Sequence, residues 1–481
     1  MGLTEITPPA LLASGSRMLR TVSRAWVSLR SNDGSRRSKA LRSSGWVVAG
    51  NAISQVVRAS TTIILARAFI GPREFGLVAL VNVFISGISL LSDLGIETDV
   101  VRHPRGDEHC FLDTAFLIQA GRGLFLFGLS SALAFPFGAW YHQPRLAWLL
   151  IAASFQILVQ GFTSSSLWTL TRNIENDKLA KLYVCSDLTG LAVSLIWASL
   201  SPTAWALVAG SLARPTVTMI GSFLLADRPF KFEWDRTAAH DIFSFGGGMF
   251  LSSVTFFFVS EAERLVVAKF ITLAELGCYS LAMTISSVPD LAFGHVISKV
   301  FLPTIAKSAQ ESPERAVINY DKMRRVLIVL CLFFSFGYIV FGKLAVNLVL
   351  GSKYFQAGWM VQLLGFRGSF QLFSGAATAM LFALGYSRYA AISNIARMIF
   401  LAIGLPIAFG FYTFREALWV LALSPLIAYI PLLVGIHRHL RPALKTELLC
   451  TATFLVLSSL FCFIHPLARA FAVSLHFWNP R

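Results

Sequence analysis

The sequence predicts an all-α membrane protein whose chain crosses the bilayer many times. Hydrophobic residues make up 55% of the chain and charged residues only 14%, whereas an ordinary soluble domain carries about 25% charged residues. The mean hydropathy is +0.65. Apolar runs of the ~20 residues that a membrane-spanning helix needs recur along almost the whole chain. No segment is both polar enough and long enough to form a separate soluble domain.

Each long apolar run predicts one helix, which gives twelve core helices and a thirteenth near the C-terminus. Residues 467–478 are apolar but short for a span, so the sequence leaves thirteen and fourteen helices as alternatives. The predicted helices are 46–68, 75–101, 111–136, 146–170, 179–200, 203–225, 242–268, 276–299, 326–349, 357–384, 389–412, 416–436 and 447–464. The longest predicted loop is about 300–325, between the eighth and ninth helices.

A repeated motif predicts how these helices are organised. The stretch "ILARAFIGPREFGLVAL" (64–80) is similar to "VVAKFITLAELGCYSL" (266–281), with Glu-apolar-Gly at an offset of 201 residues. Six predicted helices separate the two copies, so both copies keep one orientation and form a parallel repeat. The predicted parts are listed in chain order: a basic arm 1–45, an N-lobe 46–226, a C-lobe 227–440 and one or two extra helices in 441–481.

Basic residues predict the orientation in the membrane. The N-terminal arm and the loops on its side of the membrane hold 26 Lys and Arg residues, whereas the opposite loops and the C-terminus hold 8. This asymmetry predicts a cytoplasmic N-terminus, and it explains much of the +16 net charge without nucleic acid. In the arm, Leu19, Val22, Trp26 and Leu29 share one helical face. The arm is therefore expected either to lie on membrane lipids as an amphipathic helix or to be disordered.

The cysteine pattern favours neither a disulfide framework nor a metal site. Six cysteines are scattered among the predicted helices and none forms a Cys-x-x-Cys pair. The stretch "RHPRGDEHC" (102–110) gathers potential ligands, but juxtamembrane loops are commonly rich in such residues. No Gly-rich GKS or GKT loop is present. We therefore expect no metal, no cofactor and no ATP hydrolysis by the chain itself.

The first copy of the motif also carries a family resemblance. The stretch "ILARAFIGPREFGLVALVNVFISGISLLSDLG" (64–95) resembles the start of the polysaccharide transporters of the multidrug/oligosaccharidyl-lipid/polysaccharide exporter superfamily. The resemblance implies two six-helix lobes around a central cavity in the bacterial inner membrane. It implies a flippase, not an enzyme, that moves a polyprenyl-pyrophosphate-linked oligosaccharide from the cytoplasmic to the periplasmic leaflet by alternating access. The oligosaccharide would be a repeat unit of O-antigen, exopolysaccharide or capsule. A polymerase and glycosyltransferases would be its partners.

Several arginines lie at membrane depth, where a charge is expensive unless it faces a wet cavity or a partner. Arg58 lies in a polar stripe on the first helix, and the stripe comprises Asn51, Ser54, Gln55, Arg58 and Thr62. Each deep arginine is interpreted either as a bundle staple or as part of a cationic site for phosphate, which guanidinium binds bidentately. Arg214, next to Pro215, is interpreted as a staple, and Arg264 lies nearer the outer surface. The predicted substrate-binding residues are Asn51, Gln55, Arg58, Arg122, Arg367 and Arg397.

Acidic residues at depth are fewer and allow two interpretations. Asp187, Glu261 and Asp290 are candidates for carrying a coupling proton or sodium ion, or they form salt bridges with the arginines. Two other functions stay open at this stage. A membrane polysaccharide polymerase or glycosyltransferase would need an exposed catalytic loop, and the 300–325 segment has no DxD pair. A drug or cation antiporter of the same superfamily is disfavoured by the excess of deep arginines over acids.

Overall fold

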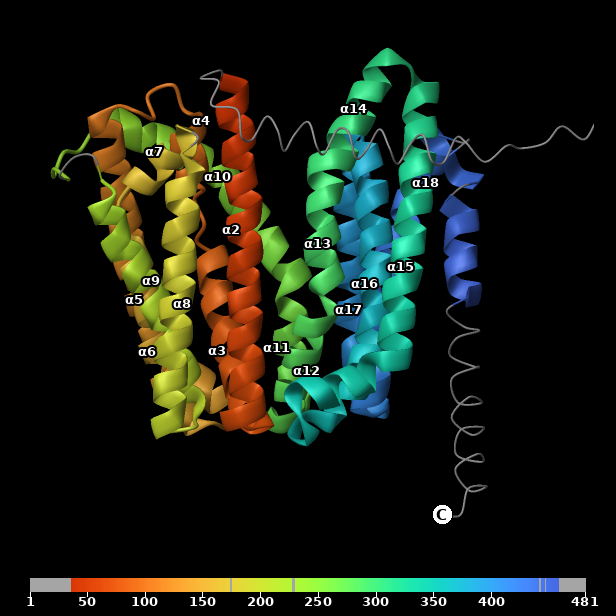
Figure 1. Cartoon of the computed structure of the whole chain (residues 1–481), viewed down its shortest axis with the longest axis horizontal. Coiled ribbons are helices and arrows are strands. Elements are labelled where there is room, and N and C mark those ends of the chain that lie inside the picture. The colour runs from red at the N-terminus through yellow and green to blue at the C-terminus, as the bar shows by residue number, and fades with distance from the viewer. Residues whose placement is uncertain (1–35, 174, 227–229, 441–442, 446, 458–481) are drawn as a thin grey trace, which may run out of the picture.

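The computed structural model describes residues 36–457 except 174, 227–229, 441–442 and 446, and every regular element within them is a helix (Figure 1). The predictions for the N-terminal arm before residue 36 and for residues 467–478 lie outside the described residues. The thirteenth predicted helix is helical over the described residues 447–457.

The structure contains helices that cross the molecule and shorter helices that connect them. They are α2 (Arg36–Ile64), η1 (Leu65–Phe69), α3 (Pro72–Leu90), α4 (Ile96–Arg102), α5 (His109–Trp140), α6 (Pro144–Gly161), α7 (Ser166–Arg172), α8 (Asn176–Leu200), α9 (Ala204–Leu224), α10 (Arg236–Ser260), α11 (Ala262–Phe270), α12 (Leu273–Ser286), α13 (Val288–Val296), η2 (Ile297–Phe301), α14 (Leu302–Glu311), α15 (Pro313–Leu350), η3 (Ser352–Tyr354), α16 (Phe355–Ala383), α17 (Arg388–Phe411) and α18 (Phe414–His439).

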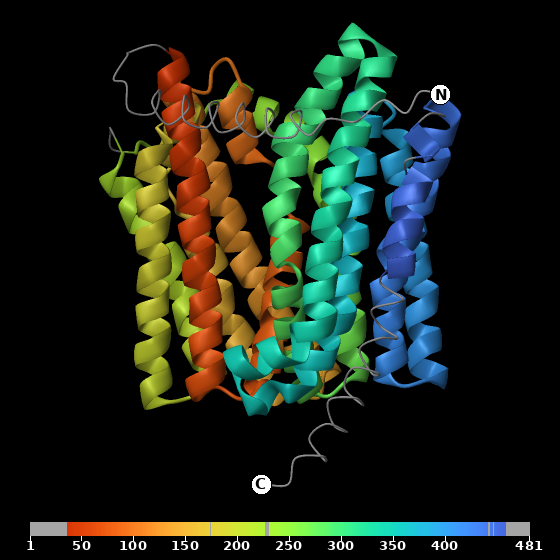
Figure 2. The same ribbon diagram turned by 45° about the vertical axis from the view of Figure 1, so that its right-hand side comes forward.

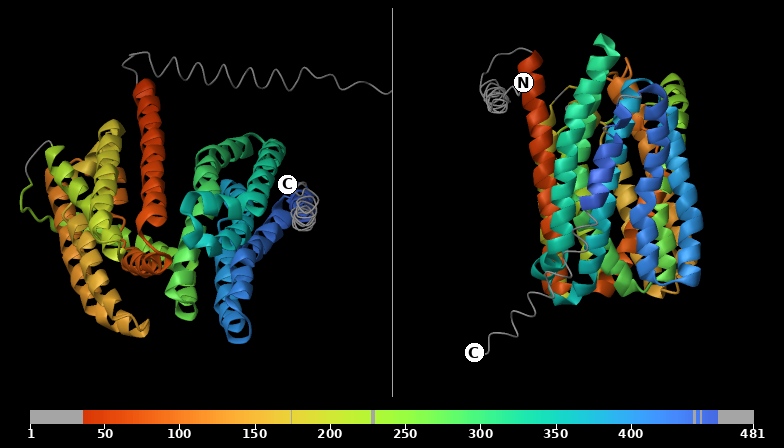
Figure 3. Two further views of the ribbon diagram at one scale, coloured as in Figure 1. Left: turned by 60° about the horizontal axis from the view of Figure 1, so that its bottom comes forward. Right: turned by 90° about the vertical axis from the view of Figure 1, so that its right-hand side faces the viewer.

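The helices form two bundles that lie side by side (Figures 1 and 2). The first bundle comprises α2–α9 and the second comprises α12–α18, while α10 and α11 run between them. We call the end that holds the start of α2 and the α14–α15 turn the upper end, and the opposite end the lower end (Figure 1). Seen from the lower end, α3 and α12 join the two bundles (Figure 3).

Seven helices of the described chain are long and apolar enough to cross a membrane, or eight if α6 and α7, bent by 60°, count as one span. They are α3, α5, α8, α9, α15, α17 and α18. The predicted first span, within α2, falls outside this set because Asn51, Gln55 and Arg58 lower its mean hydropathy. A multi-pass helical membrane protein is the result, as the composition predicts.

The prediction of a loop at 300–325 is wrong, because this segment is helical almost throughout. Helix α14 ends at Glu311 and α15 begins at Pro313, so only Ser312 separates them. The Ser312 side chain accepts a hydrogen bond from the Arg315 N–H and caps α15. The sequence-based boundary follows the apolar run, which begins near residue 326, whereas the helix itself begins 13 residues earlier with polar residues. These helices extend beyond the other elements at the upper end (Figure 2).

The predicted single helix 75–101 is instead broken into α3 and α4. The break covers residues 91–95 and ends at Gly95, whose φ of 61° is in the left-handed region that glycine tolerates. A Cβ at Gly95 would lie 2.6 Å from the Met249 side chain of α10. The break therefore lets α10 pass close to the first bundle.

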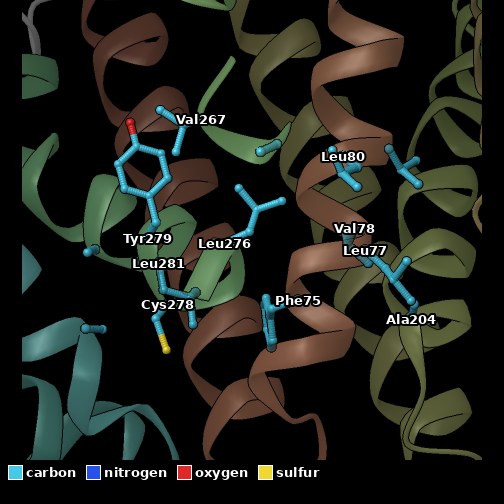
Figure 4. Packing of buried hydrophobic residues seen from close by; sticks show 14 of the residues in the cluster. Phe75, Leu77, Val78, Leu80, Ala204, Val267, Leu276, Cys278, Tyr279 and Leu281 are labelled. Atoms are coloured by element: carbon cyan, nitrogen blue, oxygen red, sulfur yellow. The ribbon is translucent and has the colours of Figure 1, made fainter. Parts of the chain in front are cut away.

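The two bundles meet through a reciprocal contact between α3 and α12 near the lower end. A Cβ on Gly76 would lie 1.9 Å from the carbonyl oxygen of Leu273, and a Cβ on Gly277 would lie 1.9 Å from that of Pro72. The second contact reproduces the first at the 201-residue offset of the sequence repeat. Phe75 and Leu276, at the same offset, lie buried between the two helices (Figure 4). Only glycine permits this close approach of backbones.

At the same end, four side chains donate hydrogen bonds to backbone carbonyls, two between the first bundle and α11 and two between the two bundles. Lys269 donates to Trp140 O at 2.7 Å, and Tyr141 donates to Leu265 O at 2.9 Å. Tyr354 donates to Ile70 O at 2.9 Å, and Arg67 donates to Leu348 O. We call these contacts and the α3–α12 contact the lower seal.

At the upper end, the loop after α4 holds the start of α10. Arg105 donates to the Asp235 carboxylate at 2.7 Å, and Asp235 caps α10 by accepting from the Thr237 N–H at 2.8 Å. The Thr237 hydroxyl and the Arg105 guanidinium, both bonded to this carboxylate, hold the pKa of Asp235 well below its usual range. The start of α10, the helix that follows the first bundle in the chain, is thereby fixed to that bundle.

Candidate substrate site

A cavity of about 250 Å³ lies between the two bundles, above the lower seal. Its walls come from α2, α3, α8 and α9 on one side and from α11 and α12 on the other. Three arginines line it: Arg58 from α2, Arg214 from α9 and Arg264 from α11. We call this space the interbundle cavity.

Arg58 is held by Asp187 of α8. Its Nε and one terminal nitrogen donate to the two carboxylate oxygens at 3.0 and 3.3 Å. The Asp187 side chain is 2% exposed, whereas that of Arg58 is 51% exposed. Arg214 approaches the same carboxylate, with its Nε 3.7 Å from an Asp187 oxygen. Because each guanidinium carries five N–H donors, one buried carboxylate orients two arginines and leaves donors free for the cavity.

Arg264 completes the cationic wall from the other side. It pairs with Glu261, the C-terminal capping residue of α10, at 3.1 Å. Three guanidinium groups therefore meet two carboxylates, which leaves one positive charge in excess among these residues. Phosphate oxygens match the planar guanidinium fork better than a point cation does. The arrangement is suited to binding an anion inside the membrane.

Arg122, Arg367 and Arg397, three of the predicted site residues, are not among those that line this cavity. Arg122 donates to Ser92 O at 2.7 Å and to Ser89 O at 3.0 Å, so it fastens the end of α3. Arg367 and Arg397 share the buried Glu263 carboxylate, at 2.7 and 3.2 Å.

The polar stripe on α2 divides in the structure. Arg58 and Thr62 line the interbundle cavity, whereas Asn51 and Gln55 are exposed on α2 and are not among its lining residues. Ser54 is buried, and its hydroxyl has no hydrogen-bond partner within the described part of the chain. Of the arginine and the two amides in the stripe, only the arginine, Arg58, is among the residues that line the cavity.

The three acidic candidates for ion coupling lie in different surroundings. Asp187 and Glu261 are the counterions of the cavity arginines, as described above. Asp290 lies on α13 beside Gly368 of α16, where a Cβ would be 3.6 Å from its carboxylate oxygens. One of those oxygens is buried without a hydrogen-bond partner in the described chain. A role in ion coupling stays a prediction for all three.

The sequence did not indicate that Arg214 and Arg264 join Arg58. Arg214, interpreted as a staple, does pair with Asp187 of α8, and it also lines the interbundle cavity. Helix α9 continues through Pro215 without a break. The sequence does not show which helices pack together. Helix α8 packs on both α2 and α9, and this brings Asp187 of α8 close to both Arg58 and Arg214. Among the described residues, no group of three His, Cys, Asp or Glu side chains could hold a metal ion.

Comparison with solved structures identifies the fold. The chain aligns with lipid II flippase MurJ in an inward closed conformation at 15% identity and a TM-score of 0.60, over 89% of this chain and 98% of that one. It aligns with an inward-facing multidrug resistance MATE family transporter of the MOP superfamily at 13% identity and a TM-score of 0.58, over 83% and 95% of the two chains. The chain therefore has the helical membrane fold that MATE transporters and MurJ share.

The sequence comparisons then give the family. The family model described as "Polysaccharide biosynthesis protein" matches residues 64–358, more than half of the chain, so the protein belongs to this family. Lipopolysaccharide biosynthesis protein WzxC of Escherichia coli is 23% identical over 63% of this chain. Succinoglycan biosynthesis transport protein ExoT of Rhizobium meliloti is 24% identical over 57%. The chain spans 61% and 55% of the length of these two relatives.

Proposed function

We propose that this protein is a flippase that moves a polyprenyl-pyrophosphate-linked oligosaccharide from the cytoplasmic to the periplasmic leaflet by alternating access. The cargo is a repeat unit of O-antigen, exopolysaccharide or capsule. The relatives WzxC and ExoT carry names from lipopolysaccharide and succinoglycan biosynthesis, which supports this class of cargo. Glycosyltransferases would supply the substrate and a polymerase would consume it.

The observation that carries the proposal is the convergence of Arg58, Arg214 and Arg264 on one cavity between the bundles. A pyrophosphate offers several anionic oxygens, and charge-assisted hydrogen bonds to such oxygens are roughly twice as strong as neutral ones. The cationic excess also disfavours a cationic drug as cargo. Residues 300–325, where a polymerase would need an exposed catalytic loop, are occupied mainly by α14 and the start of α15, which lends no support to a polymerase.

The orientation and the repeat are part of the same proposal. Lower-end residues such as Arg73, Arg145 and Arg415 belong to the side with few basic residues, which supports a periplasmic lower end and a cytoplasmic upper end in an inner membrane. The reciprocal glycine contact supports two six-helix lobes related by rotation about the membrane normal, with residues 46–226 as the N-lobe and 227–440 as the C-lobe. Residues 1–45 and 441–481 would flank them. Separation of the lower seal would release the cargo to the periplasm.

A reconstituted assay tests this function. The purified chain is placed in proteoliposomes with a fluorescent undecaprenyl-pyrophosphate-linked oligosaccharide, and translocation is measured as the fraction that becomes accessible to an impermeant quencher. We expect translocation far above that of empty liposomes. Rates equal to those of empty liposomes, together with rapid exchange of a cationic dye, would replace the flippase with an antiporter.

A further inference from the structure

We propose that the sugar residue next to the pyrophosphate occupies a second chamber, inside the first bundle, and that Gln156, Gln160 and Tyr183 recognise its hydroxyl groups. This inference rests on the proposed function, because it assigns a further part of the same cargo to a separate subsite. The chamber has a volume of about 430 Å³, which is within the ~300–1,000 Å³ range of small-molecule sites. We call it the bundle chamber.

The bundle chamber adjoins the cationic wall of the interbundle cavity. The two spaces share Arg58, Asn82, Ser211 and Arg214. A pyrophosphate bound to Arg58 and Arg214 would therefore have the bundle chamber at its side. The group covalently attached to that pyrophosphate is the first sugar, so the chamber is within reach of it.

The walls of the bundle chamber are polar but almost uncharged apart from the shared arginine pair. Amide, hydroxyl and phenol groups face it from α3, α6, α8 and α9, and Asp187 is the only carboxylate among its described lining residues, where it is already bonded to Arg58. Amides both donate and accept hydrogen bonds, as sugar hydroxyls do. This chemistry fits a neutral polyhydroxyl group better than a second phosphate or a cation.

The side chains that line the chamber are free to bind a ligand. Within the described chain, the side chains of Asn82, Gln156, Gln160, Thr163 and Tyr183 make no hydrogen bond to any protein group. Unpaired amides inside a membrane-spanning bundle are expensive unless water or a ligand satisfies them. A core that served packing alone would carry apolar side chains at these positions. The unpaired set therefore points to a hydrated subsite that exchanges water for sugar hydroxyls.

The experiment compares two kinds of lipid on the full chain in nanodiscs. Dissociation constants are measured for undecaprenyl pyrophosphate and for the same lipid carrying one galactose, glucose or N-acetylglucosamine. We expect the wild type to bind at least one sugar-bearing lipid more tightly than the bare lipid. The Gln156→Leu/Gln160→Leu variant should lose on the order of tenfold in affinity for that lipid, while its affinity for the bare lipid stays unchanged.

Two further variants keep the test decisive. Tyr183→Phe removes only the phenolic hydroxyl and should weaken the sugar-bearing lipid alone, in a protein whose melting temperature is unchanged. Gln356→Leu makes the same chemical change at an exposed position on α16 and should bind both lipids as the wild type does. A wild type without preference for any sugar, or chamber variants that keep the preference or lose both lipids equally, would overturn the subsite. A wild type that binds neither kind of lipid would instead overturn the proposed function.

Discussion

Two arginine–carboxylate pairs in this protein differ in what surrounds them. Arg324 of α15 and Glu447 form an ion pair at 2.7 Å in which both side chains are 0% exposed. Tyr320 and Tyr429 also donate to Glu447, and the Arg324 guanidinium lies 4.3 Å from the centre of the Phe373 ring. Arg58 and Asp187 pair at a similar distance, 3.0 Å, but the Arg58 side chain is 51% exposed and lines the interbundle cavity.

The difference separates a structural charge from an available one. The Arg324 pair is enclosed by partners that satisfy its charge, and it fastens the helix that contains Glu447 to α15 and α18. The Arg367 and Arg397 pairs with Glu263 are of the same enclosed kind. In the Arg58 pair only the carboxylate is enclosed, so the guanidinium can exchange partners. An arginine at membrane depth is therefore expected to serve transport when its own guanidinium is exposed to a cavity, even if its carboxylate partner is buried.

The largest expected effect is on the enclosed pair. Arg324→Met leaves the Glu447 carboxylate buried without its cation, and breaking a buried pair in this way typically costs about 3–5 kcal/mol. We expect a strong fall in the melting temperature of the purified protein. Arg325→Met, at the exposed neighbouring position, is the matched control and should melt as the wild type does. Adding Glu447→Gln to Arg324→Met should recover part of the loss, and no recovery would show that the charge is not the cause.

The next largest effect is expected at the lower seal, where α3 and α12 are in close contact. Gly76→Ala places a Cβ 1.9 Å from the Leu273 carbonyl oxygen, so α3 and α12 must move apart. Overpacking of this kind typically costs about 1–3 kcal/mol. We expect a lower melting temperature and faster labelling, by an impermeant maleimide, of a cysteine introduced at Leu276, which is buried in the α3–α12 contact.

Gly121→Ala is the control for the seal, because a Cβ there meets nothing within 4 Å. It should change neither the melting temperature nor the labelling rate. Unchanged labelling in Gly76→Ala would mean that the α3–α12 contact does not close the lower end.

The sequence predicted a multi-pass helical fold and the approximate positions of the apolar helices, because long apolar runs decide where helices lie in a membrane. It did not predict their number: the described chain has seven candidate spans, or eight with the bent pair, and the predicted helices 146–170, 242–268 and 276–299 are each divided. It misplaced the start of α15, whose first turns are polar and extend beyond the apolar run. The repeat located Gly76 and Gly277, but not that each would touch the backbone opposite the other. Depth identified Arg58 as a candidate. Its partners Asp187 and Arg214 depend on how α2, α8 and α9 pack, which periodicity within one helix does not specify.

The smallest effect on stability is expected for Arg58→Ala, although this variant should lose transport completely. In Arg58→Ala the Asp187 carboxylate keeps Arg214 nearby. The Arg58 side chain in the lost pair is half exposed, which limits the contribution of the pair to stability. Arg58→Lys keeps the charge but loses the planar fork, so it should retain partial transport. Arg145→Ala, at an exposed lower-end position, should transport as the wild type does.

The most direct test of the account measures two quantities on the same purified Arg58→Ala protein. They are the rate at which an undecaprenyl-pyrophosphate-linked oligosaccharide is flipped in proteoliposomes, and the melting temperature. We predict flipping at the rate of empty liposomes with a melting temperature within about a degree of the wild type. A marked fall in melting temperature that Asp187→Asn reverses, with flipping restored in the double variant, would contradict it. Arg58 would then be a staple like Arg324.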